Sequence, residues 1–490
     1  MVFKIKKYKW IVLIVFLLFF IFVGVVYSSI DYWSDGYRVN HLSQKEVYHG
    51  NANGTAKEAY DCHIVTNNNS SNDYFVPTKT TTEWNAFTSS LPANVAVEGC
   101  PIFGSEYVFY STGSTPEIYS AALDSTHFVL VFRDCNNNNF GTAMIGTTNG
   151  SAISFSPKFV FNSGVSSLLD IVILNSNSFV VSFMDSSANY SHKAVVGTVS
   201  GSNISFGSSY MFRANGSYQD KPSISKLDTS HFVVTYPKDS GKIGIARVGT
   251  VSGYIISYGP EYIFHNYSTE YPDVVALDSN HFVVSYRHVN KNIVGSDGFY
   301  EAYSAAKVGT VSGSAISFGA EYVFYPLLSQ YFKIEKLDST HFLIMFENTY
   351  TKYYSLRHTS VIVGSTSGSN ISFGPLSVIL ERGSSSYNNG IAILDSTHFV
   401  ASFPYGVDNP PKGIVKFGTI NGLNISFSKE FVFNLSGTGA TDYLNVTNLE
   451  PSRFVISFID YLNSEFPPSY PFVLSSKSII GKIYEYVSLP

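Results

Sequence analysis

The chain has 490 residues and a formal net charge of −5, and only 14% of its residues are charged while 16% are aromatic. This composition lacks the basic surface that nucleic-acid binding requires, so we exclude nucleic acid as a partner. Three cysteines are too few for a disulfide scaffold, and polarity that comes mainly from hydroxyl and amide side chains is common in extracellular β proteins.

The N-terminus predicts a membrane anchor. Residues 1–9 carry four lysines and form a basic tail, and residues 10–27 are an uncharged apolar run of 18 residues, the lower limit for crossing a bilayer. Lysines before the span place the tail in the cytoplasm and the rest of the chain outside. A cleaved signal peptide, giving a secreted protein, is the alternative, because Val26-Tyr27-Ser28 is a weak cleavage site.

Residues 28–95 are rich in Asn, Ser and Thr, and we predict a stalk or collar there. Cys62 and Cys100 flank one polar segment and either pair with each other or remain thiols, while Cys135 stands alone in a predicted loop. No Cys/His spacing of the zinc-site type occurs. We therefore expect no metal and no cofactor.

A repeat organises residues 96–490. Its clearest copy is Leu123-Asp124-Ser125-Thr126-His127-Phe128. The seven copies begin at Leu123, Leu174, Leu227, Leu277, Leu337, Leu394 and Leu449. Intervals of 51, 53, 50, 60, 57 and 55 residues match the length of a four-stranded propeller blade and exceed most helical repeats.

Each unit predicts four antiparallel strands. The first strand ends at Leu-Asp, the second follows the Asp-Ser-Thr turn, the third runs through Val-Gly-Thr-Val, and the fourth follows a Ser-Gly-Ser turn. Second strands such as 128–132 are apolar on both faces, as expected for blades packed between neighbours rather than for a two-sheet sandwich. The sequence thus predicts an all-β, seven-bladed β-propeller of four-stranded antiparallel blades, preceded by an N-terminal transmembrane helix.

The two ends of the repeat region predict how the ring closes. Residues 102–110 match only a fourth strand, whereas residues 478–483 match a third strand with no good fourth strand after it. The N-terminal strand is therefore expected to complete the C-terminal blade, which removes an exposed sheet edge.

Through L-D-S-T-H-F-V-V-x-[FY] and V-G-T-V-S-G-x-x-I-S-F-G, residues 100–485 resemble β-propeller repeat proteins of the secreted or surface-displayed microbial and viral kind. The resemblance implies the fold and carries no activity, because propellers host both binding platforms and enzymes.

Five histidines recur in register, each three residues after an Asp, but Ser178 and Arg453 replace them in two copies. We interpret this position as part of an Asx-type turn rather than as a shared metal or proton-transfer site.

The two ends of the blades differ. The Asp-Ser-Thr and Ser-Gly-Ser turns are nearly uniform and are expected on one face of the ring, which we call the constant face. The other connections are long and dissimilar, and they are expected on the opposite face, which we call the variable face. Variation collected on one face commonly marks a binding surface. Its aromatic and acidic residues are the candidate ligand-binding residues: Tyr218, Tyr267, Tyr271, Asp297, Phe299, Tyr300, Tyr331, Tyr353, Tyr387, Tyr405 and Tyr443. The alternative is that these rings pack beneath their own loops.

No nucleophile elbow, phosphate-binding loop, zinc-protease motif or calcium loop occurs, so we assign no catalytic residue. Asp220, Glu270, Asp273 and Asp442 lie near predicted first strands and are candidates to meet at the ring axis.

We therefore expect a membrane-anchored extracellular module that binds a glycan or protein through its variable face, with adhesion as its role. An enzyme acting on polysaccharide, a hydrolase or a lyase, and a structural surface-coat protein are the alternatives. Sequons such as Asn189, Asn266 and Asn445 suit a glycoprotein.

Overall fold

The computed structural model describes residues 46–48, 61–66, 95–97, 101–112, 117–150, 152–217, 221–238, 243–294, 300–349, 357–381, 389–405, 412–428, 430–433, 441–462 and 473–483. The chain divides into two compact units, one comprising Met1–Ile102 with Ile483–Pro490 and the other comprising Phe103–Lys482.

The first unit contains a small antiparallel sheet of β1 (Glu46–Tyr48), β2 (Asp61–Thr66) and β3 (Val95–Val97), in that order. The predicted membrane span at residues 10–27 lies outside the described residues. In the part of the chain that the structure describes, no helix has the length and apolar character needed to cross a membrane.

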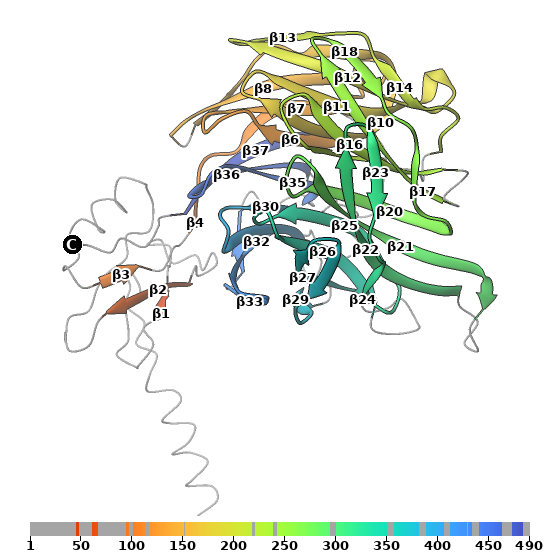
Figure 1. Cartoon of the computed structure of the whole chain (residues 1–490). Coiled ribbons are helices and arrows are strands. Elements are labelled where there is room, and N and C mark those ends of the chain that lie inside the picture. The colour runs from red at the N-terminus through yellow and green to blue at the C-terminus, as the bar shows by residue number, and fades with distance from the viewer. Residues whose placement is uncertain are drawn as a thin grey trace, which may run out of the picture. The chain divides into compact units, whose positions relative to one another are not determined.

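The second unit is an all-β propeller, as predicted (Figure 1). The strands of its first part are β4 (Pro101–Phe103), β5 (Tyr107–Thr112), β6 (Ile118–Ala122), β7 (His127–Asp134), β8 (Phe140–Asn149), β9 (Ala152–Phe155), β10 (Phe159–Asn175), β11 (Ser178–Asp185), β12 (Ser191–Ser200), β13 (Asn203–Phe206) and β14 (Tyr210–Arg213). A one-turn 3₁₀ helix, η1 (Ser186–Ala188), follows β11.

Two further sheets follow in the sequence. They consist of β15 (Ser223–Lys226), β16 (His231–Lys238), β17 (Ile243–Ser252), β18 (Ile255–Tyr258) and β19 (Tyr262–His265), then β20 (Ser268–Ala276), β21 (His281–Val294), β22 (Tyr300–Ser312), β23 (Ala315–Phe318) and β24 (Tyr322–Tyr325).

The remaining strands complete the propeller. They are β25 (Ser329–Lys336), β26 (His341–Thr349), β27 (Arg357–Ser367), β28 (Asn370–Phe373), β29 (Ser377–Leu380), β30 (Gly390–Ile393), β31 (His398–Tyr405), β32 (Lys412–Asn421), β33 (Asn424–Phe427), β34 (Phe431–Val432), β35 (Thr441–Glu450), β36 (Arg453–Leu462) and β37 (Val473–Ile483).

The prediction of seven separate four-stranded blades is wrong in two respects. Five blades form separate sheets, and each has five strands because the predicted fourth strand is broken into two short strands that pair with the same neighbour, as β23 and β24 both pair with β22. At the break, a Cβ on Gly319 would lie 2.5 Å from the Ser369 carbonyl oxygen. The close approach of the next repeat's backbone explains why this position is a glycine.

The first two repeats share a nine-stranded sheet. Its shared strand is β10, whose first half pairs with β8 and whose second half pairs with β11. Asn162 and Val165 in the connection pair with Gly141 and Phe140 of β8, so the chain stays extended where the other repeats have a loop. This continuous strand joins two hairpins that we predicted to lie in separate blades.

The first strand of each repeat belongs to a closed inner ring. These inner strands are β6, β10, β15, β20, β25, β30 and β35; each contacts the next, and β35 contacts β6. The last sheet joins distant parts of the chain, because β5 pairs antiparallel with β37 from Tyr107 opposite Ser478 to Thr112 opposite Leu474. Opening the ring therefore requires breaking this ladder.

The hydrophobic core lies between neighbouring sheets. In one cluster Val283 and Val308, from the sheet of β21 and β22, pack with Phe342 and Ile362, from the sheet of β26 and β27. The second strand of each repeat is buried on both faces, as in β16. At the outer strands, in contrast, the apolar residue in the middle of a Tyr-x-Phe or Phe-x-Phe segment points to solvent. These residues are Val108, Val160, Met211, Ile263 and Val323, between 44% and 56% exposed.

Candidate functional site

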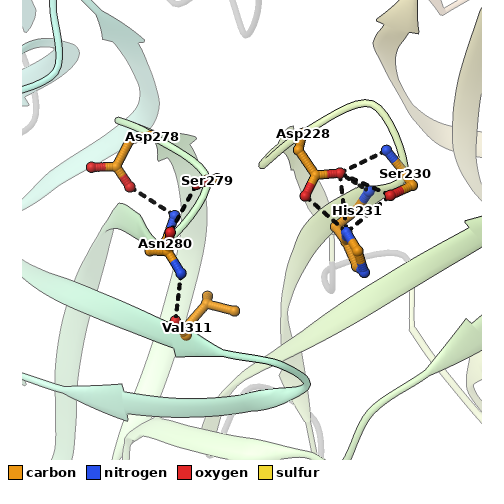
Figure 2. A network of polar contacts seen from close by, with 7 residues as sticks. All are labelled: Asp228, Ser230, His231, Asp278, Ser279, Asn280 and Val311. Atoms are coloured by element: carbon orange, nitrogen blue, oxygen red, sulfur yellow. Dashed lines mark hydrogen bonds and ion pairs between the residues drawn. The ribbon is translucent and has the colours of Figure 1, made fainter.

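The recurrent Asp and His residues form a structural turn. Figure 2 shows Asp228 turned toward Ser230 and His231: its Oδ1 accepts hydrogen bonds from the two backbone N–H groups at 2.7 and 2.8 Å, and its Oδ2 lies 2.8 Å from His231 Nδ1. In the next repeat Asp278 caps the Asn280 N–H in the same way, and Asn280 Nδ2 donates to the Val311 carbonyl at 3.2 Å (Figure 2). The side chain thus fixes the hairpin.

The same bonds stabilise the ionised Asp. Partial burial alone would raise the pKa of Asp124, but hydrogen bonds from Thr126 and His127 outweigh it and lower that pKa to about 2. Asp338 is similarly lowered to about 2 by Thr340 and His341. Each histidine binds the Asp of its own repeat, so these histidines do not form a shared site.

Four of the eleven predicted ligand-binding residues have described side chains. Tyr267 is 62% exposed, whereas Tyr271, Tyr331 and Tyr443 are half-buried. Tyr300 and Tyr405 begin β22 and end β31, and only their backbone is described. Tyr218, Asp297, Phe299, Tyr353 and Tyr387 lie outside the described residues.

A backbone irregularity recurs where inner strands begin at the variable face. The strand pairing shifts register between Glu270 and Asp273 in β20 and between Gln330 and Lys333 in β25. At these shifts Tyr271 and Tyr331 adopt φ angles of 51° and 58°. Leu168 and Tyr443 occupy the same position in their repeats with φ angles of 52° and 51°. Such angles strain a non-glycine residue by roughly 1–3 kcal/mol, so the surrounding fold must impose them.

Two of these strained positions bring their rings together. Tyr271 and Tyr331 make an edge-to-face contact with ring centroids 5.1 Å apart. The guanidinium of Arg287 lies 4.8 Å from the Tyr271 centroid, donates to the Ser329 carbonyl at 3.0 Å and pairs with the Glu270 carboxylate. We call these four residues, Tyr271, Tyr331, Arg287 and Glu270, the Tyr–Arg rim.

A histidine pair lies beside Tyr267. His265 Nε2 and His288 Nδ1 are 2.9 Å apart, so one ring donates a hydrogen bond and the other accepts it, and His265 Nδ1 lies 3.1 Å from Glu321. Tyr303 stacks on His288 with centroids 4.4 Å apart. Burial alone would raise the pKa of Glu321, but hydrogen bonds from His265, Tyr286 and Tyr303 lower it to about 2. Both histidines are buried, and His288 packs against the rings of Tyr267 and Tyr303.

Polar side chains converge at the axis from several inner strands. Lys221 Nζ donates to the Tyr119 hydroxyl at 2.9 Å and lies 4.7 Å from the centroid of that ring, while Lys333 Nζ lies 5.5 Å from the same centroid. Asp170, Asp273 and Glu335 interact electrostatically with this group. We name these six half-buried residues the axial cluster: Tyr119, Asp170, Lys221, Asp273, Lys333 and Glu335.

Two carboxylates of the axial cluster hold neighbouring inner strands together. Asp170 accepts a hydrogen bond from the Ile224 backbone N–H at 3.0 Å, and Asp273 accepts one from the Ile334 N–H at 3.0 Å. Asp273 also accepts from the Ser223 hydroxyl at 2.6 Å. At the same repeat position Asn445 accepts from the Ser120 N–H at 3.1 Å. These bonds explain why the axis retains acids in strands that are otherwise apolar.

Burial at the axis favours the protonated form of two of these acids. Desolvation, followed by repulsion from Asp273, raises the pKa of Glu335 to about 8 although Lys333 opposes the shift. Desolvation also raises the pKa of Asp170, against the attraction of Lys221 and Lys333. Among the described residues no group of three or more His, Cys, Asp or Glu has a geometry suited to a metal ion. The axial cluster is thus suited to hydrogen bonding and proton donation.

Of the four acids predicted to meet at the ring axis, the structure describes the side chains of two and places them in different clusters. Asp273 belongs to the axial cluster and Glu270 to the Tyr–Arg rim. Asp220 lies outside the described residues, and only the backbone of Asp442 is described. The residues predicted from the sequence did not include Tyr119, Asp170, Lys221, Lys333 or Glu335. Aligning the repeats on their Leu-Asp would have found three of them, because Tyr119, Asp170 and Lys333 all stand four residues before the Leu.

No family model matches the chain, and no curated protein matches its sequence. Among solved structures it is similar to a hypothetical selenium-binding protein from Sulfolobus tokodaii, with 8% identity, a TM-score of 0.47, and coverage of 76% of this chain and 94% of that one. A protein of unknown function from Dyadobacter fermentans has 10% identity, a TM-score of 0.43, and coverage of 78% and 99%. An ulvan lyase of polysaccharide lyase family PL25 has 8% identity, a TM-score of 0.44, and coverage of 73% and 96%.

Proposed function

We propose that this protein is a cell-surface binding module that takes a saccharide at the Tyr–Arg rim of its variable face. The observation that carries the proposal is the Tyr271–Tyr331 pair, fixed at strained backbone positions beside the Arg287–Glu270 ion pair. Strain of this kind is maintained only when the surrounding structure enforces it, and it concentrates at ligand-binding sites.

The chemistry of the Tyr–Arg rim suits a sugar ring. A tyrosine offers an apolar face for stacking and a hydroxyl for hydrogen bonding. Because its side chain is rigid, it loses little conformational entropy when a ligand binds. The ion pair adds charged donors and acceptors whose orientation is already fixed, which lowers the ordering cost of binding. Tyr267, 62% exposed in the connection between β19 and β20, adds further aromatic surface just before the strand that carries Tyr271.

Anchoring and location belong to the same proposal. The basic tail at residues 1–9 and the apolar run at residues 10–27 support a single-pass protein with a cytoplasmic N-terminus and an extracellular propeller. If that segment is cleaved, the propeller is secreted and the binding role is unchanged. The test is protease protection of the full-length chain in sealed membrane vesicles.

A glycan-array experiment with the full-length chain in detergent tests the binding site. We expect Tyr271→Leu and Tyr331→Leu to lower affinity for the bound glycans about tenfold or more, because each removes a stacking face. Tyr254→Leu is the matched control, since Tyr254 is 40% exposed in the turn between β17 and β18 on the constant face. Equal losses from all three variants, or glycan binding that none of them affects, would contradict the proposal.

A polysaccharide-acting enzyme is the second candidate, favoured by one observation. Glu335, with its pKa raised to about 8, remains protonated at neutral pH, as a general acid must. The measurement is the release of new chain ends from a polysaccharide panel by the wild type and by Glu335→Gln. Release by the wild type that the variant abolishes would establish the enzyme; no release across the panel would reject it.

A further inference from the structure

The two lysines of the axial cluster have hydrogen-bond donors that no described protein group accepts. Within the described part of the chain the Lys333 side chain makes no hydrogen bond, and its ammonium lies over the face of the Tyr119 ring. Lys221 donates one hydrogen bond, to Tyr119, which leaves two N–H groups on its ammonium. Both lysine residues are half-buried.

The neighbouring acids do not take up these donors. Asp170 accepts from the backbone N–H groups of Ile171 and Ile224 at 2.9 and 3.0 Å, and Asp273 accepts from Ser223 and Ile334. Both carboxylates are therefore held at the strand backbones, away from hydrogen-bond contact with either lysine. The Glu335 carboxyl group makes no hydrogen bond to any described residue. Its neutral form at pH 7 adds one more O–H donor.

The hydrogen-bonding groups left unused in the axial cluster are mainly positively charged donors. The group that complements them is an anion with several acceptor atoms. Carboxylate and sulfate have this chemistry, and charge-assisted hydrogen bonds to them are the strong ones. Two of the inner strands connect this cluster to the Tyr–Arg rim, because Asp273 and Lys333 follow Tyr271 and Tyr331 by two residues.

We infer that Lys333, Lys221 and Glu335 bind the acidic group, carboxylate or sulfate, of a saccharide whose ring contacts the Tyr–Arg rim. This inference rests on the proposed saccharide-binding function and names the ligand class. The rim would supply contacts that any sugar ring can use, and the axial cluster would select for acidic sugars.

Calorimetry on the full-length chain with three probes tests the selection. The probes are trigalacturonic acid, a sulfated galactan trisaccharide and neutral galactotriose. Lys333→Gln is expected to weaken binding of an acidic probe about ten- to a hundredfold while changing the neutral probe less than about twofold, because only the acidic probe loses a charge-assisted hydrogen bond. Lys336→Gln is the matched control, because Lys336 lies on the same strand and is exposed.

The results of these measurements distinguish the acidic-group assignment from the proposed saccharide site. Equal affinity of the wild type for acidic and neutral probes, with both weakened by Tyr331→Leu, would overturn the acidic-group assignment and leave the saccharide site standing. No binding of any probe or array glycan would overturn both. A preference between the carboxylate and sulfate probes identifies the group. Thermal unfolding midpoints of Lys333→Gln and Lys336→Gln show whether a loss reflects misfolding, and Glu335→Gln, which keeps a donor, is expected to retain the acidic preference.

Discussion

The ring of Phe282 covers Gly309, its directly opposite partner on the neighbouring strand, so closely that a Cβ on Gly309 would lie 2.1 Å from the ring. The equivalent pair occurs in every repeat, from Phe128 over Gly146 to Phe454 over Gly481. The glycine of Val-Gly-Thr is therefore required by packing, whereas Gly313 in the following turn has a φ of 62° and open space around it.

Gly309→Ala is expected to lower the free energy of unfolding by about 1–3 kcal/mol or more, because the fully buried Phe282 must move. Gly313→Ala is the comparison, with an expected loss of about 1 kcal/mol from backbone strain alone. Guanidinium denaturation of the full-length chain measures both. An equal or smaller loss at Gly309 would contradict the packing explanation.

The Asp turns predict weaker stability in acid. The folded pKa of Asp338, about 2, lies below the usual value near 3.9, so its contribution is complete above pH 5 and is lost as the pH falls toward 2. Its side chain is 45% exposed, so the contribution is below about 1 kcal/mol. Asp338→Asn should reduce the loss of stability between pH 5 and 2.5, measured by urea midpoints. Asn175 already fills this position in one repeat and still accepts a backbone N–H at 3.1 Å.

We expect the buried ion triad at the ring closure to contribute strongly to the stability of the fold. Lys477 of β37 contacts Glu106 at 2.7 Å, from the N-terminal side of the closure, and Asp460 of β36 at 2.5 Å. Although burial alone would lower the pKa of Lys477, the two carboxylates raise it. Lys477→Met leaves Asp460 buried without its cation, and we expect a loss of about 3–5 kcal/mol.

Limited proteolysis can locate that effect. Because the triad lies at the β5–β37 ladder, Lys477→Met should expose the N-terminal strand to cleavage before the rest of the propeller. Lys193→Met provides the comparison, since its ion pair with the buried Asp185 lies within the pair of strands β11 and β12 and outside the β5–β37 ladder. Uniform cleavage of both variants would argue against a local role in closure.

Binding of an acidic saccharide should weaken with rising pH. Glu335 loses its proton near its raised pKa of about 8, and the new carboxylate, facing Asp273, Asp170 and Lys333, would repel an anionic ligand. Titration of trigalacturonic acid between pH 6.5 and 9 should show this loss in the wild type and not in Glu335→Gln. A parallel decline in both would assign the effect to another group.

The outer strands supply a test of the surface-coat alternative. Ile263 and Val323 are 52% and 50% exposed on outer strands, where a charge costs little stability. If the protein assembles through these edges, Ile263→Lys with Val323→Lys should abolish self-association in analytical ultracentrifugation. A wild type that stays monomeric at all concentrations would reject the coat alternative.

Particular residues show which features of the fold could be predicted from the sequence. Period and strand pattern predicted the propeller, and the Asp-Ser-Thr-His turn was correctly assigned a structural role, because both depend on local chemistry repeated many times. The number of separate blades was wrong, since only the ladder between Asn162 and Gly141 shows that β10 passes from one repeat into the next. Loop length alone did not reveal that pairing.

The sequence by itself determined the repeat, the turn chemistry and the doubly buried second strands, because hydrogen bonding and alternation act between residues that are close along the chain. Only the tertiary structure decided which side chains meet at the axis. Tyr119 and Lys333 are more than two hundred residues apart and touch because the inner strands close into a ring. Their proximity follows from ring geometry, which brings equivalent positions of different repeats together, and no local pattern encodes which charges will then face one another.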